Sequence, residues 1–295
     1  MALEIVRASA EHVLELARIL FEAFKGIHDR HRFPLDIPSM DVALMMVEML
    51  VHRPDFYGVA AVLDGKIVGS NFTQISDGVS GVGPITVDPG CQARGVGRAL
   101  MRHVVDWSLA NHGPMVRLVQ DGFNMASLSL YTSIGFTVVE PLVLMAVSPA
   151  DHSDATVRPL VSSDLAGCHA LCTRILKVSR KNELAFMIEQ GGKAGFIPHG
   201  RFKAERLVAY VIPGFFGHGV AESAEDLLTT VTQAARHVPP PAHKVLIPAR
   251  NGELFRRALG LKMRSIKLMS LMAIGPYEEP LPPESGAAWA PSIAY

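Results

Sequence analysis

From position 85 the chain reads Ile85-Thr86-Val87-Asp88-Pro89-Gly90-Cys91-Gln92-Ala93-Arg94-Gly95-Val96-Gly97-Arg98-Ala99-Leu100. This order predicts a short strand, a tight loop and the first turn of a helix. Such a loop points several backbone N–H groups into one small volume, and the helix adds the positive end of its dipole. Gly95 and Gly97 have no Cβ to block the approach of a phosphate to the backbone. Arg94 and Arg98 add positive charge at the rim, so the stretch predicts a cradle for a pyrophosphate.

Two widespread phosphate-binding patterns do not fit this spacing. The dinucleotide fingerprint needs three glycines and an acidic residue about 20 positions later, and the nucleoside-triphosphate loop needs Gly-Lys-Ser/Thr. The chain instead carries Gln92-x-x-Gly95-x-Gly97-Arg98-Ala99-Leu100 after Val87-Asp88-Pro89.

This pattern resembles the acyl-CoA loop of the GNAT family of N-acyltransferases, Gln/Arg-x-x-Gly-x-Gly/Ala, which lies between the fourth strand and the third helix. A second segment, running from Asn124 to Phe136, is similar to the family's fourth helix, whose tyrosine lies four residues before a Gly-Phe pair; that tyrosine is Tyr131 here. The resemblance implies an α/β fold with a mixed sheet. It also implies transfer of an acetyl group from acetyl-CoA to a primary amine.

The resemblance carries a set of residues expected to bind acetyl-CoA as co-substrate. In the loop and first helical turn they are Gln92, Ala93, Arg94, Gly95, Val96, Gly97, Arg98 and Ala99. The family separates two strands near this point, and Pro84, which cannot donate a ladder hydrogen bond, is consistent with such a gap. A backbone N–H near Ile85 or Val87 is then expected to polarise the thioester oxygen. Asn124 and Ser127 are expected to bind the pantetheine or the phosphates.

The resemblance also implies that Tyr131 is the general acid that protonates the leaving thiolate. The general base stays open, because Asp77, Asp121 and Glu140 are all candidates and each also suits an ordinary surface or turn position. Gly26 to Pro38 predicts a loop or a broken helix. In this family the region between the first two helices often walls the acceptor site, so its residues His28, His31 and Arg32 are candidate substrate contacts.

Composition excludes several classes of protein. The 295 residues are 49% hydrophobic, with 28 basic and 28 acidic residues and a formal net charge of zero. This balance argues against partners such as nucleic acid or an anionic membrane. The longest apolar stretches are too short to span a bilayer, and the N-terminus lacks the features of a signal peptide. Three cysteines make no even disulfide framework, which favours the cytoplasm. Cys168 and Cys172 fall on the apolar stripe of a helix, so no metal site is predicted.

The pattern of the chain restarts after a polar linker. Thr156-Val157-Arg158-Pro159-Leu160 echoes Glu4-Ile5-Val6-Arg7-Ala8. We therefore expect two tandem GNAT-like folds: an acetyl-CoA-binding domain at 1–147, a linker at 148–155 and a shortened, degenerate copy at 156–273. The copy has Glu222-Ser223-Ala224-Glu225 in place of the loop and Arg256 in place of Tyr131. An unrelated β-rich domain is the alternative for this half, and the lone histidine of Gly217-His218-Gly219 is interpreted as structural.

The Pro-rich tail at 274–295 allows two interpretations. It can be a disordered end, or its Trp289, Ile293 and Tyr295 can dock it onto the protein. For the whole chain we expect an N-acetyltransferase that acts on a small amine as a monomer or homodimer. The alternative is a non-catalytic protein that binds or senses CoA through the same loop. The acceptor and the length of the acyl group stay open.

Overall fold

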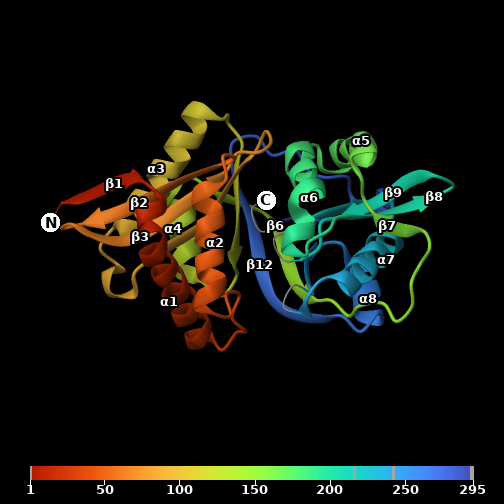
Figure 1. Cartoon of the computed structure of the whole chain (residues 1–295), viewed down its shortest axis with the longest axis horizontal. Coiled ribbons are helices and arrows are strands. Elements are labelled where there is room, and N and C mark those ends of the chain that lie inside the picture. The colour runs from red at the N-terminus through yellow and green to blue at the C-terminus, as the bar shows by residue number, and fades with distance from the viewer. Residues whose placement is uncertain (1, 215–216, 241–242, 293–295) are drawn as a thin grey trace. The chain divides into compact units, whose positions relative to one another are not determined.

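The computed structural model describes residues 2–214, 217–240 and 243–292. The chain forms two units (Figure 1). The first comprises Met1–Thr137 with Met272–Pro276, and the second comprises Val138–Leu271 with Tyr277–Tyr295. The sequence-based division instead falls at 147. The two divisions differ because two long strands each cross from one unit to the other.

The first unit is built on a mixed sheet in the order β1-β2-β3-β4-β5, followed by the end of β12. Its elements are β1 (Leu3–Arg7), α1 (Val13–His31), α2 (Met40–His52), β2 (Phe56–Leu63), β3 (Lys66–Gln74), β4 (Ser80–Val87), α3 (Val96–Asn111), β5 (Val116–Asp121) and α4 (Met125–Ile134). Strands β1 to β4 pair antiparallel, and β4 pairs with β5 in parallel. The carboxyl ends of β4 and β5 therefore lie at the same edge of the sheet.

Alternating residues of β2 bury their side chains on opposite faces of this sheet. Ala60 packs in the core beneath α1 and α2, which lie side by side in Figure 1. Val59 and Ala61 belong to a separate core with α3 and Tyr131 of α4. This period of two is what a strand covered on both faces requires. At the Asp64-Gly65 turn both residues have positive φ, 49° and 79°, as the tight hairpin between β2 and β3 requires.

Helix α1 is longer than its sequence suggests. The predicted loop or broken helix over Gly26–Pro38 is wrong for its first part, because α1 continues to His31 and Arg32 ends it with a φ of 58°. An ion pair between Lys25 and Asp29, one turn apart, supports this end of the helix. His28 has no exposed surface there, so burial of one side chain outweighs the low helix propensity of Gly26.

The second unit contains two groups of strands. Its elements are β6 (Thr137–Ala146), β7 (Val157–Pro159), α5 (Leu165–Leu176), α6 (Lys181–Ala194), β8 (His199–Lys203), β9 (Arg206–Val211), β10 (Gly219–Ala221), α7 (Ala224–Ala234), β11 (Lys244–Pro248), α8 (Gly252–Gly260), β12 (Arg264–Ile274) and β13 (Ala288–Ala290). One sheet has the order β13-β10-β9-β8-β7, and the other group runs β12-β6-β11. Helix α7 packs its apolar face into a core shared with β9, β11 and β13.

The C-terminal tail forms a strand of the second unit. In β13, Trp289 pairs with Val220 of β10, and its side chain is only 6% exposed. The strand also contacts β11. Next to it, the Arg180 guanidinium donates to the Ser292 hydroxyl at 3.2 Å. The tail is thus docked as far as it is described, whereas Ile293 and Tyr295 lie outside the described residues.

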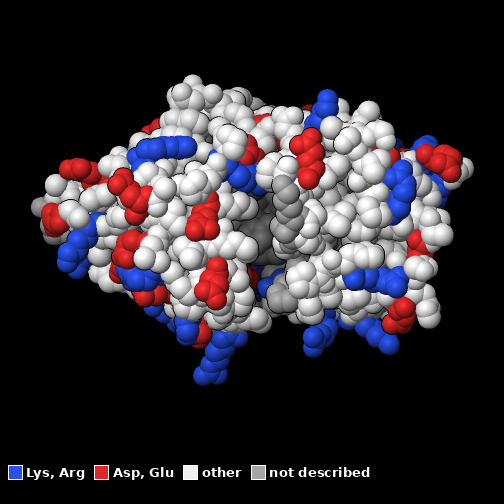
Figure 2. Space-filling view, in the orientation of Figure 1, with Lys and Arg blue, Asp and Glu red and all other residues white. Residues whose placement is uncertain are grey.

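Charged side chains of both signs are interspersed over the face shown in Figure 2. The described side chains on that face form no large patch of a single sign. In the part of the chain that the structure describes, no helix combines the length and the apolar character needed to cross a membrane.

Candidate functional site

The loop after β4 has the backbone of an anion cradle. Ala93 and Gly95 have left-handed φ values of 61° and 83°. Gly95 is the N-cap of α3 and has no side chain with which to cap it. The first helical hydrogen bond runs from Ala99 N–H to the Gly95 carbonyl, so the N–H groups of the first turn point out of the helix end. Left-handed residues close to a helix N-terminus form a concavity that suits phosphate.

The fold does not require glycine at position 97. A Cβ at this position would meet Leu130 and Val87 side-chain atoms at 3.6 Å, which is ordinary contact. Its φ is not positive, unlike that of Gly95. Because folding does not require glycine here, its place in the first turn of α3 is consistent with close approach of a ligand to the backbone. Gln92 to Gly95 are exposed, Val96 is buried, Gly97 and Ala99 are half-buried, and Arg98 is exposed.

Asp88 shapes the start of the loop. Its carboxylate accepts a hydrogen bond from Gly90 N–H at 2.9 Å and forms an ion pair with Arg18 of α1 at 2.8 Å. The hydrogen bond from Arg18 is the main reason that the pKa of Asp88 is lowered. The Gln92 amide turns back to donate to the Val87 carbonyl at 3.4 Å. These contacts hold the loop in one conformation before any ligand binds.

Strands β4 and β5 separate before the loop. Their parallel register includes Ser80 with Val116 and Gly81 with Arg117, and among the described residues it ends there. Ile85 and Val87 lie beyond this point, half-buried, and pair with β3 on their other side. Beyond Gly81, β5 thus no longer pairs with this edge of β4, and the edge continues to the loop.

Tyr131 lies in the core of the first unit, 7% exposed, edge-on to Phe136 at 6.2 Å. Burial raises the pKa of Tyr131 to about 12; a hydrogen bond with Ser127 opposes the shift, and the charge of Asp121 adds to it. The phenol is therefore protonated at neutral pH, as a proton donor must be. Asn124 caps the helix by accepting from Ser127 N–H at 3.2 Å. This cap fixes the first turn of α4, which carries Ser127, the hydrogen-bond partner of the Tyr131 phenol.

The three candidate bases lie in different places. Asp121 is the last residue of β5, at the edge of the sheet where β4 runs into the loop. Asp77 precedes the opposite end of β4, about 25 Å from the loop for an eight-residue strand, and His112 contacts its backbone carbonyl at 2.5 Å. Glu140 belongs to the second unit, where Arg250 holds its carboxylate at 2.6 Å.

His28, a candidate substrate contact, lies among acidic groups. Its Nε2 is 3.3 Å from the Asp36 carboxylate and 3.7 Å from that of Asp121. His31 is exposed and contacts the Phe123 ring at 5.1 Å, while Arg32 is exposed at the end of α1. Sequence reasoning missed Asp36. Its only signal was an acidic residue between Pro34 and Pro38, in a segment already assigned to the acceptor wall.

The corresponding helix start in the second unit carries acidic side chains held in ion pairs. β10, α7 and β11 follow one another there as β4, α3 and β5 do in the first unit. The Ser223 hydroxyl caps α7 by accepting from Asp226 N–H at 3.0 Å, and the Asp226 carboxylate binds Lys203 at 2.7 Å. Glu222 pairs with Arg206 at 2.6 Å. A side-chain cap thus takes up a helix N–H that the first unit leaves open, and Arg256 is exposed on α8.

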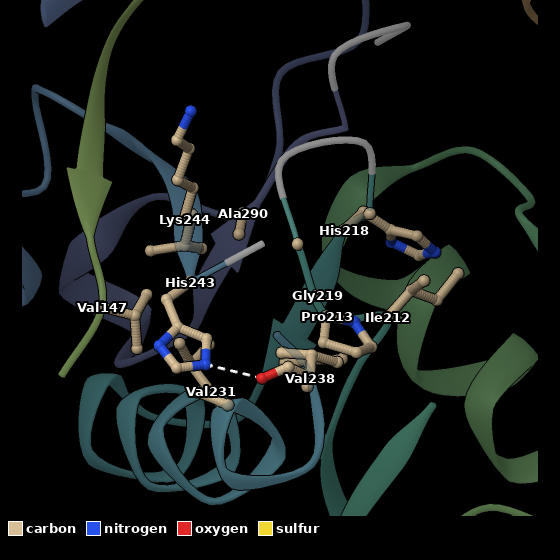
Figure 3. Close-up of a pocket in the computed structure, with 15 residues that line it drawn as sticks. Val147, Ile212, Pro213, His218, Gly219, Val231, Val238, His243, Lys244 and Ala290 are labelled. Carbon is tan, nitrogen blue, oxygen red and sulfur yellow. Dashed lines mark hydrogen bonds between the residues drawn. The ribbon is translucent and has the colours of Figure 1, made fainter. Parts of the chain in front are cut away.

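A small cavity lies in the second unit, lined in part by residues 211–214, 217–219 and 243–245 (Figure 3). His243 Nε2 contacts the Val238 carbonyl there at 2.8 Å. The neighbouring His218 is fully buried, and burial lowers its pKa, so the ring is neutral. Its ring packs edge-on against Tyr210 at 5.3 Å. The cavity of about 20 Å³ holds little more than a water molecule and does not suit a substrate.

Comparison with known proteins relates the first unit to one family. Residues 13–136 match the model of the acetyltransferase (GNAT) family. Mycothiol acetyltransferases from Nocardiopsis dassonvillei and Thermomonospora curvata are 35% and 37% identical over 32% and 30% of this chain. The chain spans only about a third of the length of these relatives, 31% and 30%.

Solved structures resemble this chain over nearly its whole length. A Pyrococcus horikoshii protein assigned as an acetyltransferase has a TM-score of 0.74 at 15% identity, with 95% of this chain and 91% of that chain covered. A tandem GNAT protein from the clavulanic acid biosynthesis pathway has a TM-score of 0.58 at 13% identity, with 94% and 100% covered. At these identities the likeness shows the fold, which is a tandem of two GNAT-like α/β halves.

Proposed function

Residues 13–136 belong to the acetyltransferase (GNAT) family, and from this premise we propose that the first unit transfers an acetyl group from acetyl-CoA to a primary amine of a small acceptor. The observation that carries the proposal is the exposed loop from Gln92 to Gly95 at the open N-terminus of α3. A loop that is already shaped loses little entropy when it binds a pyrophosphate.

The proposed binding residues divide by the part of acetyl-CoA that they meet. The pyrophosphate is assigned to the backbone of Gln92, Ala93, Arg94, Gly95, Val96, Gly97, Arg98 and Ala99, with the two arginine side chains at the rim. The open edge of β4 at Ile85 and Val87 is assigned to the pantetheine and the thioester oxygen. Asn124 and Ser127, at the start of α4, are assigned to the pantetheine or the phosphates.

Three groups of the chain then serve acetyl transfer. The loop and the open strand edge hold the thioester in place for the amine, and such positioning can supply several kcal/mol. A backbone N–H of β4 stabilises the negative charge that develops on the thioester oxygen. Tyr131 keeps its proton at neutral pH and gives it to the leaving thiolate. The named activity of the relatives, acetyl transfer, supports this reaction.

Native mass spectrometry of the chain with acetyl-CoA tests the binding site. We expect one ligand per chain, lost in Gly97→Asp and Arg94→Glu. Gly97→Ala, whose Cβ makes only ordinary contacts, checks that the loop still folds. Arg264→Glu, an exposed residue of the second unit, reproduces the charge change of Arg94→Glu and should bind normally. Binding that survives in both loop variants would refute the assignment, and two ligands per chain would move a site to the second unit.

Release of free CoA thiol in the presence of primary amines tests the reaction. Turnover that requires both acetyl-CoA and an amine would establish the transferase. If the loop binds acetyl-CoA and no amine releases the thiol, the chain is a CoA-binding or sensing protein instead.

A further inference from the structure

One imidazole and two carboxylates from three segments meet in the first unit. His28 comes from α1, Asp36 from the segment between α1 and α2, and Asp121 from the end of β5. The imidazole Nε2 lies 3.3 Å from the Asp36 carboxylate and 3.7 Å from that of Asp121. Asp36 and His28 lie 85 and 93 positions before Asp121 in the sequence. Only folding brings the three residues together.

The hydrogen bond of the His28 Nδ1 determines how its Nε2 can interact with the two carboxylates. Nδ1 lies 2.8 Å from the Phe24 carbonyl, which can only accept, so Nδ1 carries a hydrogen. A bare lone pair on Nε2 would repel the two carboxylates. Nε2 and the carboxylates therefore share at least one proton, and the three groups act as a connected set.

The two carboxylates are less completely buried than the imidazole. The His28 side chain has no exposed area, whereas those of Asp36 and Asp121 are 7% and 12% exposed. A molecule arriving from solvent therefore meets Asp36 and Asp121 before it meets His28. His28 is therefore a positioning residue rather than a substrate contact.

Asp121 lies at the same edge of the sheet as the acetyl-CoA loop. It ends β5, which runs parallel to β4, and α4 with Tyr131 begins four residues later. Its charge is one of the influences on the Tyr131 phenol, so the two side chains are close enough to interact. A base and an acid must both reach the reacting thioester, and this pair meets that requirement.

Aromatic rings border the carboxylates. Phe33 and Phe123 stack at 4.4 Å, and Phe123 meets His28 edge-on at 5.5 Å. Both phenylalanines are half-buried, so part of each ring faces solvent. Ring faces and carboxylates together attract a cationic amine on an apolar carrier. Two carboxylates also repel any acceptor that bears a carboxylate beside its amine.

We propose that Asp121 is the base that takes the proton from the acceptor amine, that His28 and Asp36 position it, and that the acceptor is an alkyl ammonium without an adjacent carboxylate. This inference rests on the proposed function. The ammonium gives one proton to the Asp121 carboxylate, and its nitrogen forms a bond to the acetyl carbon. The C–S bond breaks, and the thiolate takes a proton from Tyr131. The nitrogen then loses its second proton to the Tyr131 phenolate, which gives the N-acetyl amine and free CoA, and Asp121 releases its proton to solvent afterwards.

Phenethylamine and L-phenylalanine test the acceptor class, because they share the ring and the primary amine and differ by one carboxylate. Thiol release from acetyl-CoA should give a kcat/KM at least about 50-fold higher for phenethylamine, given the cost of placing like charges together in a desolvated site. Equal or better use of phenylalanine would overturn the acceptor class. So would the absence of turnover with phenethylamine while acetyl-CoA is bound.

Variants test the role of Asp121. Asp121→Asn should lower kcat by at least about 100-fold while leaving the affinity for acetyl-CoA unchanged. The defect should shrink at about pH 9.5, where much of the amine is already deprotonated in solution. A merely structural role would not be rescued in this way. Asp106→Asn removes an exposed carboxylate of α3 and is the matched control.

The positioning residues give smaller and separable effects. His28→Gln and Asp36→Asn should each lower kcat by about 10-fold, and Asp36→Glu should restore part of it. If Asp121→Asn does not fold, Asp121→Glu keeps the charge but displaces it and should still lower kcat.

The outcomes separate this inference from the proposed function. A wild-type chain that does not bind acetyl-CoA refutes both. Normal kcat in folded Asp121→Asn refutes the base alone. Loss of turnover on treatment with a chelator, restored by zinc, would assign the cluster to a metal ion and overturn the proposal.

Discussion

The guanidinium of Arg18 lies 2.8 Å from the carboxylate of Asp88, which fastens α1 to the first residue of the loop after β4. The same carboxylate accepts from Gly90 N–H within the loop. One side chain thus connects the helix that leads to His28 with the loop assigned to acetyl-CoA. The connection makes α1 a support for both ends of the proposed site.

Removing this ion pair should weaken acetyl-CoA binding more than it weakens the fold. We expect Arg18→Met and Asp88→Asn to raise the Kd by about 3- to 10-fold, because the loop must then be ordered on binding. The melting temperature should move little, since the two side chains are 37% and 23% exposed. Isothermal titration calorimetry measures the affinity. Lys25→Met, which removes another ion pair of α1, is the control, and an unchanged Kd in both loop variants would contradict the prediction.

The lowered pKa of Asp88 determines the pH range over which its ion pair with Arg18 persists. A carboxylate whose pKa is lower in the folded protein stabilises it above the unfolded pKa, near 4, and loses this effect as the pH falls through the folded value. The Kd for acetyl-CoA in the wild type should therefore not reflect Asp88 titration between about pH 5 and 8. Calorimetry of wild type and Asp88→Asn across this range should give a constant ratio. A ratio that converges to one by pH 5 would show that Asp88 is already protonated there.

Tyr131→Phe should separate catalysis from binding. The phenylalanine keeps the ring packed against Phe136 and removes only the hydroxyl. We expect kcat to fall by about 100- to 1,000-fold with the Kd for acetyl-CoA nearly unchanged. Steady-state kinetics with calorimetry on the same sample measures both, and Tyr57→Phe is the control. Full activity in Tyr131→Phe would remove Tyr131 from the mechanism.

The buried phenol should also destabilise the fold at alkaline pH. Its pKa is raised to about 12 in the folded protein, so its contribution is complete below pH 10 and is lost as the pH rises from the unfolded value toward the folded one. The rise in the pKa from 10 to about 12 corresponds to about 2–3 kcal/mol of the free energy of unfolding. Urea unfolding at about pH 9, 10 and 11 should show a shallower decline in Tyr131→Phe than in the wild type. Parallel declines would mean that Tyr131 ionises normally.

The docked tail should stabilise the second unit through Trp289. Trp289→Ala removes a large side chain that is only 6% exposed, and we expect a loss of about 3–5 kcal/mol. In a Trp107→Phe background Trp289 is the one remaining tryptophan of the chain, so its emission reports the tail. The emission should be blue-shifted and should move to the red before the first unit unfolds. Emission typical of exposed tryptophan in the native protein would show that the tail is undocked in solution.

Local patterns were sufficient for much of the first unit. Two glycines and two arginines predicted the loop and the start of the helix that follows it, and the Asp64-Gly65 pair is a local signal for the hairpin of β2 and β3. Both rest on backbone preferences that act within a few residues. The prediction failed at Gly26, where α1 continues because His28 is buried, and burial depends on partners distant in sequence.

By itself the sequence determined the loop, the helix caps and the order of elements, since each depends on neighbours along the chain. Only the tertiary structure decided which of Asp77 and Asp121 lies at the loop end of β4, because parallel pairing of β4 and β5 sets which strand ends share an edge of the sheet. It also brought Asp36 to His28 and paired Trp289 with β10. Contacts between residues far apart in sequence depend on how sheets and helices pack, and no local pattern of residues specifies them.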